Sequence, residues 1–216
     1  MQSSAAKIQQ TAVRSSRVRQ KNIKVILQAA EDEFVLSGFK GASIRDIATR
    51  AGLPKANIHY YFNSKVDLYG AVLGHIMELW EAVFSGLNIE DDPASAFRQY
   101  IQAKMQYCLA HANASRIFSS EIIHGGQHLK EHFEYFKSWI KEKSRVIESW
   151  VEQGKMDPVD PLHLLFTIWA TTQYYVDYSP QVACVIGKEA LSDEDLEAAT
   201  EHLCNLIIKG CGIRNR

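Results

Sequence analysis

The residues best suited to specific chemistry lie on a short segment around Asn57. Ile58, Tyr61 and Phe62 recur at spacing i, i+3 and i+4, so they share one face of a helix and should pack into a core. The side chains left outside are short, polar or cationic, and they are Lys55, Ala56, Asn57, His59 and Tyr60. In a DNA major groove an amide can pair with adenine and an ammonium group with guanine. The segment therefore predicts a helix that enters a major groove, with Asn57 and Lys55 contacting bases.

A second set of side chains near this segment is suited to the phosphate backbone of DNA. Ser43, Tyr60 and Lys65 can donate hydrogen bonds to phosphate oxygens, and Arg45 adds a positive charge. Lys65 also lies in the first turn of a predicted helix, where backbone N–H groups attract phosphate. The predicted DNA-binding residues are therefore Ser43, Arg45, Lys55, Ala56, Asn57, His59, Tyr60 and Lys65.

Ligand-binding chemistry is indicated on the helical segment over residues 160–178. Phe166, Trp169, Ala170, Gln173 and Asp177 follow one helical stripe, and polar groups inside an apolar stripe cost stability unless they find partners. One interpretation is a pocket for a planar imide, whose alternating N–H and C=O groups match a glutamine and a carboxylate while aromatic rings cover its faces. The alternative interpretation is an internal hydrogen bond between helices.

Neighbouring segments supply further candidates for this pocket. Glu121 shares a stripe with Ile117, Phe118 and Ile122 and should point inward, where Arg116 could pair with a carboxylate. The candidate ligand-binding residues are Trp80, Arg116, Phe118, Glu121, Trp169, Gln173 and Asp177.

Catalytic and metal-binding interpretations have little support in the sequence. His128 and His132 are spaced by four, which suits zinc, but Gly125-Gly126 should separate them from His124. The chain has neither a G-x-S-x-G nucleophile elbow nor a G-x-G-x-x-G phosphate loop. We therefore expect no enzyme activity, no cofactor and no metal. Four cysteines without C-x-x-C spacing are expected to be reduced thiols in the cytoplasm.

The elements that position the DNA-contacting residues are predicted from helix start and stop signals. A first helix carrying Ile23 to Phe34 should end near Gly38. A capping pattern from Ser43 to Asp46 opens a short helix that Gly52 ends, and Pro54 starts the next. Together they predict a helix-turn-helix, although plain packing of two short helices is the alternative.

The rest of the chain also has helical periodicity. After a long helix opened by Ser64, we expect helices over residues 94–111, 113–123, 128–153 and 160–178, a loop from Ser179 to Gly187, and a last helix over 192–210. The fold class is therefore all-α. The domains predicted are a basic flexible arm (1–18), a helix-turn-helix domain (19–67), and a ligand-binding and dimerisation domain (68–216). The last two helices have apolar residues on more than one face, so they should form a homodimer interface that includes Ile207.

The charge distribution agrees with a basic module joined to an acidic body. Residues 1–75 hold 11 of the 24 Lys and Arg residues but 5 of the 25 Asp and Glu residues, so their net charge is +6 against −7 for the remainder. A basic module suggests a polyanionic partner. The chain has no apolar run long enough to cross a membrane and no signal peptide, so neither a membrane nor a secreted location is expected.

Residues 23–73 resemble the DNA-binding domain of the tetracycline-repressor (TetR) family. The resemblance is carried by the ordered pattern I-L-Q-A-A-E-D-E-F-x-x-x-G-F-x-G-A-S-I-R-D-I-A-x-x-A-G-L-P-K-A-N-I-H-Y-Y-F-x-S-K-x-D-L. Two departures are Pro54, where the family often has Ser or Thr, and Ala56, where it often has Gly. The segments 114–123, 151–155 and 160–182 are similar to the branch of the family that regulates pyrimidine utilisation.

The resemblance implies a homodimeric regulator of transcription that binds operator DNA and is released by a small effector. For the pyrimidine-utilisation branch that effector is a uracil- or thymine-like ring. A repressor is favoured over an activator. Alternatives are a relative that responds to a hydrophobic drug or another metabolite, and an all-α protein or enzyme acting on small molecules, which would leave the basic first 75 residues without a role.

Overall fold

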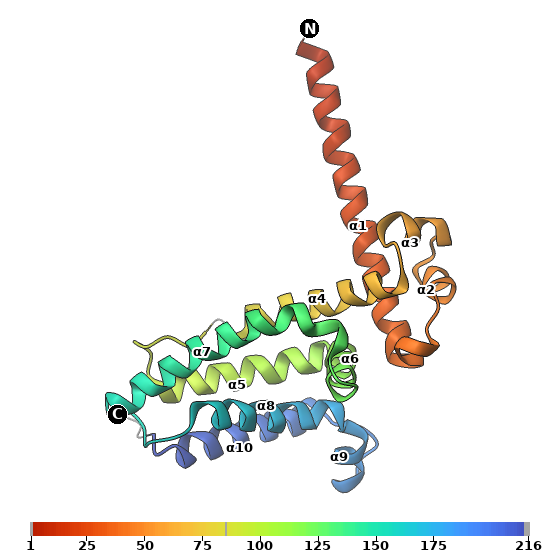
Figure 1. The fold of residues 1–216 in the computed structure, drawn as a ribbon. Helices are drawn as coiled ribbons and strands as arrows, with labels where there is room; N and C mark the ends of the chain where they lie inside the picture. The colour runs from red at the N-terminus through yellow and green to blue at the C-terminus, as the bar shows by residue number, and fades with distance from the viewer. Residues whose placement is uncertain (1, 85, 214–216) are drawn as a thin grey trace. The chain divides into compact units, whose positions relative to one another are not determined.

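The computed structural model describes the backbone of residues 2–84 and 86–213, and the side chains of residues 17–80 and 86–213. Over those backbone ranges the regular secondary structure is helical, without strands, which confirms the all-α fold class (Figure 1). The helices are α1 (Gln2–Gly41), α2 (Ile44–Ala51), α3 (Lys55–Tyr61), α4 (Lys65–Phe84), α5 (Pro93–Ala110), α6 (Ala112–Ile123), the 3-10 turn η1 (Gln127–Leu129), α7 (Lys130–Glu152), α8 (Pro161–Asp177), α9 (Ser179–Val185) and α10 (Asp193–Gly210). None of these helices combines the length and apolar character needed to cross a bilayer.

The chain forms two compact units, one ending at Gly74 and the other beginning at His75. The division falls inside α4, later than the predicted boundary after residue 67. The physical reason is that the first turns of α4 belong to the core of the N-terminal unit. Leu68 is fully buried, and the ring centroid of Tyr69 lies 4.8 Å from that of Phe34 in an edge-on contact.

The two short helices of the N-terminal unit begin and end at the residues predicted from sequence. The hydroxyl oxygen of Ser43 caps α2 by accepting a hydrogen bond from the backbone N–H of Asp46 (3.2 Å). Gly52 ends α2 in the left-handed conformation, with φ at 65°. Pro54 stands directly before α3, and Ile58 of α3 is fully buried. The helix-turn-helix predicted over this stretch is therefore present.

The first helix differs from its prediction at both ends. It continues to Gly41, but Gly38 inside it has φ at 65° and ψ at 171°, so the expected interruption at Gly38 appears as a kink. At its other end the helix begins at Gln2, so the backbone over residues 2–18 is helical where a flexible arm was predicted. The side chains of Lys7 and Arg14 in that arm lie outside the described residues.

The C-terminal unit is organised around α5 and α8. Helix α5 packs against α8 and α10, and α8 also contacts α6, α7 and α9. Helices α8 and α10 run side by side (Figure 1). Phe97 and Ile101 of α5 and Leu165 and Ile168 of α8 have at most 1% of their surface exposed. These residues form the core of the helices that carry the candidate ligand-binding side chains.

Most helix boundaries in the C-terminal unit agree with the predictions to within one or two residues. Asp92, Asp160 and Ser192 cap α5, α8 and α10 through their side chains. The loop predicted from Ser179 to Gly187 is wrong over most of its length, because α9 occupies residues 179–185. Pro180 lies in the first turn of α9, where its missing N–H costs nothing, and Ala183 is buried.

Candidate functional site

The outward face of α3 carries the side chains that were predicted to contact bases. Lys55, Ala56 and His59 are exposed, and Tyr60 has 78% of its surface exposed. Asn57 is half-buried at the edge of the same face. Helix α3 is held by the buried Ile58 beneath it, and Asn22 of α1 donates a hydrogen bond to the Tyr61 hydroxyl (3.2 Å). The arrangement leaves a short polar and cationic face in contact with solvent, supported by α1.

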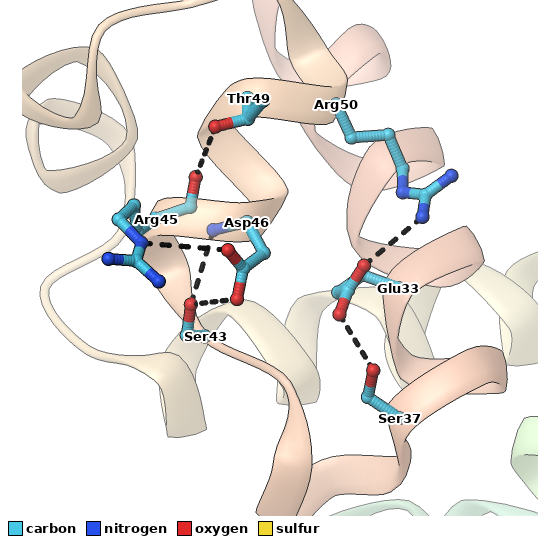
Figure 2. Close-up of polar contacts among 7 residues, drawn as sticks. All are labelled: Glu33, Ser37, Ser43, Arg45, Asp46, Thr49 and Arg50. Atoms are coloured by element: carbon cyan, nitrogen blue, oxygen red, sulfur yellow. Dashed lines mark hydrogen bonds and ion pairs between the residues drawn. The ribbon is translucent and has the colours of Figure 1, made fainter.

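Ser43, Arg45 and Asp46 form a set of polar contacts at the start of α2 (Figure 2). The Ser43 hydroxyl donates to a carboxylate oxygen of Asp46 (2.5 Å) while accepting from the Asp46 backbone, so its main contact is within the helix cap. Arg45 is 84% exposed at its side chain and lies 3.6 Å from the other carboxylate oxygen of Asp46. An exposed ion pair of this kind contributes little to stability, so Arg45 can turn toward a phosphate group at low cost.

A buried carboxylate fixes α2 against α1 (Figure 2). Glu33 has 8% of its surface exposed, and its two oxygens accept from the Arg50 guanidinium (3.2 Å) and the Ser37 hydroxyl (2.8 Å). A charged donor and a hydroxyl together satisfy the carboxylate, which would be costly to bury alone. This link holds the first helix of the helix-turn-helix in place.

Lys65 has a role that differs from its predicted contact with phosphate. Its ammonium group donates to the backbone carbonyl oxygens of Phe39 (2.7 Å), Ala42 (2.9 Å) and Lys40 (3.3 Å), and it lies 4.8 Å from the centroid of the Phe39 ring. An ammonium group has three N–H donors, so these carbonyl groups occupy all of them. Lys65 therefore ties the start of α4 to the end of α1, and a phosphate contact would have to break one of these bonds.

In the C-terminal unit, Gln173 and Asp177 join a polar network between α8 and α6. The Ser115 hydroxyl donates to one carboxylate oxygen of Asp177 (2.8 Å), and the Ser119 hydroxyl donates to the other (2.5 Å). Gln173 donates from its side-chain amide to the Ser119 oxygen (3.3 Å). The polar residues of the α8 stripe thus find partners on a neighbouring helix. This is what the alternative interpretation, an internal hydrogen bond between helices, predicts.

Aromatic side chains lie next to members of this network along the chain, Trp169 one turn before Gln173 on α8 and Phe118 beside Ser119 on α6. The indole N–H of Trp169 donates to the Tyr100 hydroxyl (2.7 Å), and the ring of Phe136 lies 5.4 Å from that of Trp169. Trp80 packs on Phe118 with ring centroids 4.3 Å apart. Burial raises the pKa of the Tyr100 hydroxyl, so it remains protonated and able to donate. Flat apolar walls and a few convergent polar groups are typical of a small-molecule site.

The most unusual residue of this region is the buried Lys104, which was not among the predicted ligand-binding residues. It has 2% of its surface exposed, its ammonium nitrogen lies 3.9 Å from the Cys108 sulfur, and it lies 5.1 Å from the Trp80 ring centroid. Burial lowers the pKa of Lys104 and raises the pKa of the Cys108 thiol. A signal existed in the sequence, because Lys104 interrupts the apolar stripe of α5 between Ile101 and Cys108.

Two predicted ligand-binding residues have other partners. Arg116 is exposed and donates to the Ser179 hydroxyl oxygen (3.3 Å), rather than pairing with an inward carboxylate. Glu121 is buried, as predicted, but accepts from the backbone N–H of His128 (2.8 Å) and lies 3.1 Å from its imidazole nitrogen. Its carboxylate is thus used to hold η1 against α6. The described residues contain no group of three His, Cys, Asp or Glu side chains placed to hold a metal ion.

An apolar groove of about 510 Å³ lies on the surface formed by α8, α9 and α10. Its lining includes Tyr174, Val185 and Leu206, which are respectively 44%, 80% and 52% exposed. Ile207, which was predicted at a dimer interface, is instead 6% exposed and faces the core of its own unit. The register of α10 thus places Leu206, not Ile207, on the outer face.

Comparison with known proteins gives two family matches that together span most of the chain. Residues 26–72 match the family described as bacterial regulatory proteins, tetR family, and residues 73–214 match the C-terminal region of YcdC-like proteins. The chain is 39% identical over 204 residues to the HTH-type transcriptional regulator RutR of Escherichia coli O157:H7, covering 94% of this chain and 96% of that protein. It is 33% identical over 107 residues to the HTH-type transcriptional repressor NicS of Pseudomonas putida, about half of each chain.

Solved structures support the same fold. The TetR family transcriptional regulator PfmR from Thermus thermophilus superposes with a TM-score of 0.69 at 18% identity, covering 88% of this chain and 99% of that one. The fatty acid degradation regulator FadR from Bacillus halodurans superposes with a TM-score of 0.67 at 18% identity, covering 89% and 97% respectively. At this level of identity the likeness concerns the fold alone.

Proposed function

The chain belongs to the TetR family of transcription regulators, and on that premise we propose that it binds operator DNA as a homodimer and releases it when a pyrimidine such as uracil or thymine binds its C-terminal unit. The families and relatives that it matches are those of regulators and not of enzymes. Because its target is chromosomal DNA, the protein would act in the cytoplasm.

The DNA contact is supported by the exposed face of α3. Asn57 and Lys55 would contact base edges, Ala56 would lie against a thymine methyl group, and Tyr60 would donate to a phosphate. Arg45 would add a phosphate contact from α2, and His59 lies on the same exposed face as Tyr60. We leave Lys65 out of this set because its donors are occupied by backbone carbonyl groups.

The homodimer is supported by the apolar groove on α8, α9 and α10. Exposed apolar area of this kind normally marks an interaction surface, and tyrosine is enriched at such interfaces. A second copy would pack its own α8 and α10 against this face in a two-fold arrangement. Two recognition helices would then reach half-sites about 34 Å apart on the DNA.

The pyrimidine effector is supported chiefly by one observation, the network that joins Gln173, Asp177, Ser115 and Ser119 beside Trp169. Its amide, carboxylate and hydroxyl groups can exchange their mutual hydrogen bonds for the N–H and C=O groups of a ring imide. The neighbouring aromatic side chains, Trp169 on α8 and the Trp80–Phe118 pair, would cover the ring faces. Trp80 and Phe118 complete the proposed site.

Release of DNA follows if the effector prefers one arrangement of the dimer. A ligand shifts an equilibrium only by its difference in affinity for the two states. A small change in the distance between the recognition helices weakens both half-site contacts together, so the effector would act by selecting the spacing that does not match the operator.

A gel-shift titration with DNA from the gene's own upstream region tests the DNA-binding part. We expect binding that weakens with salt and is reversed by uracil or thymine. Calorimetry on wild type and Gln173→Leu with uracil, thymine and cytosine tests the effector part. The variant should lose the ligand and keep operator binding, because a leucine leaves the ring's polar groups without a partner. No heat with any of the three bases on an operator-competent wild type would remove the pyrimidine proposal while leaving the DNA-binding role standing.

A further inference from the structure

We propose that Lys104 determines which effectors bind, by donating a charge-assisted hydrogen bond to a ring carbonyl oxygen while Asp177 accepts from the adjacent ring N–H. This inference rests on the proposed pyrimidine site and names the groups that discriminate within it. The expected ligands are cyclic imides and amides in which a carbonyl group and an N–H group are neighbours in the ring.

Three observations support a position for Lys104 in this site. It comes from α5, whose Tyr100 one turn earlier accepts the indole N–H of Trp169. Its ammonium nitrogen lies 5.1 Å from the ring centroid of Trp80, which packs on Phe118 of α6. Burial lowers the pKa of Lys104, and the charge of Asp177 on α8 partly offsets this lowering.

The charges and donors of the pair suit a ring imide. Each carboxylate oxygen of Asp177 accepts one serine hydroxyl, and a carboxylate has about four acceptor positions, so further positions can take a ring N–H. Lys104 adds a charged donor to the neutral donors of Ser115, Ser119 and Gln173. A positive and a negative group on facing helices therefore present one strong donor and one strong acceptor, which matches the C=O and N–H of one imide edge.

Two of the contacts of Lys104, with Cys108 and with Trp80, are of kinds that a ligand oxygen can replace with a gain. A thiol sulfur is a weak acceptor, and the face of an indole attracts a cation less strongly than an oxygen at hydrogen-bond distance does. A hydrogen bond from an ammonium group is about twice as strong as one between neutral groups. Because the cost of burying Lys104 is met on folding, the bond to the effector adds directly to binding.

The chain offers a matched control in a second buried lysine. Lys143 of α7 has 4% of its surface exposed and donates to the Leu87 backbone carbonyl (3.3 Å) and the Glu142 carboxylate (3.1 Å). Both of its acceptors are protein groups outside the proposed site. Lys143→Met therefore removes a buried ammonium group with the same change of shape as Lys104→Met, without touching the effector.

The test is calorimetry of wild type, Lys104→Met and Lys143→Met with uracil and with two analogues that each lack one carbonyl group, 2(1H)-pyrimidinone and 4(3H)-pyrimidinone. Lys104→Met should weaken uracil binding by about 10- to 100-fold. It should weaken the analogue that lacks the contacted carbonyl by less than about threefold, since that contact is already missing. Lys143→Met should bind all three ligands as the wild type does. Operator binding without ligand confirms that each variant is folded, and Lys104→Gln replaces Lys104→Met if the latter is not.

Uracil binding by Lys104→Met at wild-type affinity would overturn this inference. An equal loss for uracil and both analogues would overturn it as well, because a merely structural lysine weakens every ligand alike. If the wild type itself binds no pyrimidine, the proposed effector fails first and this inference with it, which distinguishes the two failures.

Discussion

Replacing Lys65 by methionine tests whether this lysine has a structural role or contacts DNA. The ammonium group of Lys65 donates to the carbonyl oxygens of Phe39, Ala42 and Lys40 over 2.7–3.3 Å, and these groups lie in the last turn of α1 and directly after it. Methionine keeps most of the side-chain volume and removes all three bonds. A phosphate contact and a structural link predict different results for this one variant.

The magnitude follows from the type and exposure of these bonds. Hydrogen bonds to charged groups contribute about 1.5–3 kcal/mol, and the partial exposure of Lys65 favours the lower half of that range, about 2 kcal/mol. For a chain of this length, 1 kcal/mol corresponds to roughly 2–4 °C in Tm, so Lys65→Met should lower Tm by about 4–8 °C. The variant should lose some operator affinity because the packing of α4 loosens. The dependence of that affinity on salt concentration should stay as in the wild type, because no phosphate contact is removed.

Lys55→Met on the exposed face of α3 is the matched control. It should leave Tm within about 1–2 °C, since surface substitutions change stability little. It should reduce the slope of log affinity against log salt concentration by up to about 0.9 per lost phosphate neutralisation, or relax a base preference if the lysine contacts guanine. Thermal melts and salt-dependent gel shifts measure both quantities. An unchanged Tm for Lys65→Met together with a flatter salt slope would refute the structural role and restore the phosphate contact predicted from sequence.

Three further predictions concern the recognition face, the dimer and pH. Asn57→Ala should cost about 1–3 kcal/mol of operator affinity and relax the preference at one base pair; a selection experiment with randomised operators that returned the wild-type sequence preference would contradict this. Leu206→Glu, which puts a charge into the α8–α10 groove, should give monomers by sedimentation, whereas Leu162→Glu, at another exposed position of α8, should stay dimeric. The pKa of Lys104 is lowered by burial, so between this lowered pKa and the ordinary value of 10.5 the unfolded chain binds more protons than the folded protein. The free energy of unfolding of the wild type should therefore rise, relative to that of Lys104→Met, as the pH increases through this window. Parallel curves of unfolding free energy against pH for the two proteins, measured in urea, would refute this prediction.

The helices and the helix-turn-helix could be predicted from the sequence because their signals are local. The Ser43 cap, the left-handed Gly52 and the position of Pro54 each act within one or two turns of helix, so spacing alone predicted where α2 ends and α3 begins. The face of α3 that carries Lys55 and Tyr60 was predicted for the same reason, since burial of Ile58 decides it.

The partners of polar side chains depend instead on long-range packing. Ser115 and Ser119 lie more than 50 residues from Asp177 and Gln173, and nothing in local periodicity selects them as donors. In the sequence, Lys65 is a cation in the first turn of a helix and nothing local indicates its partners. The three carbonyl oxygens that it contacts reach it only when α1 and the residue after it pack against the start of α4.

Lys104 combines both cases. Its interruption of the apolar stripe of α5 is visible in the sequence, and it indicates a buried charge. That this charge lies beside Trp80 of α4 depends on how helices from separate parts of the chain pack. Packing of helices depends on side-chain shape summed over many long-range contacts, whereas a helix and its caps depend on residues within a few positions of each other. The order of residues along the chain therefore indicates which face of each helix is buried, while the three-dimensional packing selects which side chains meet there.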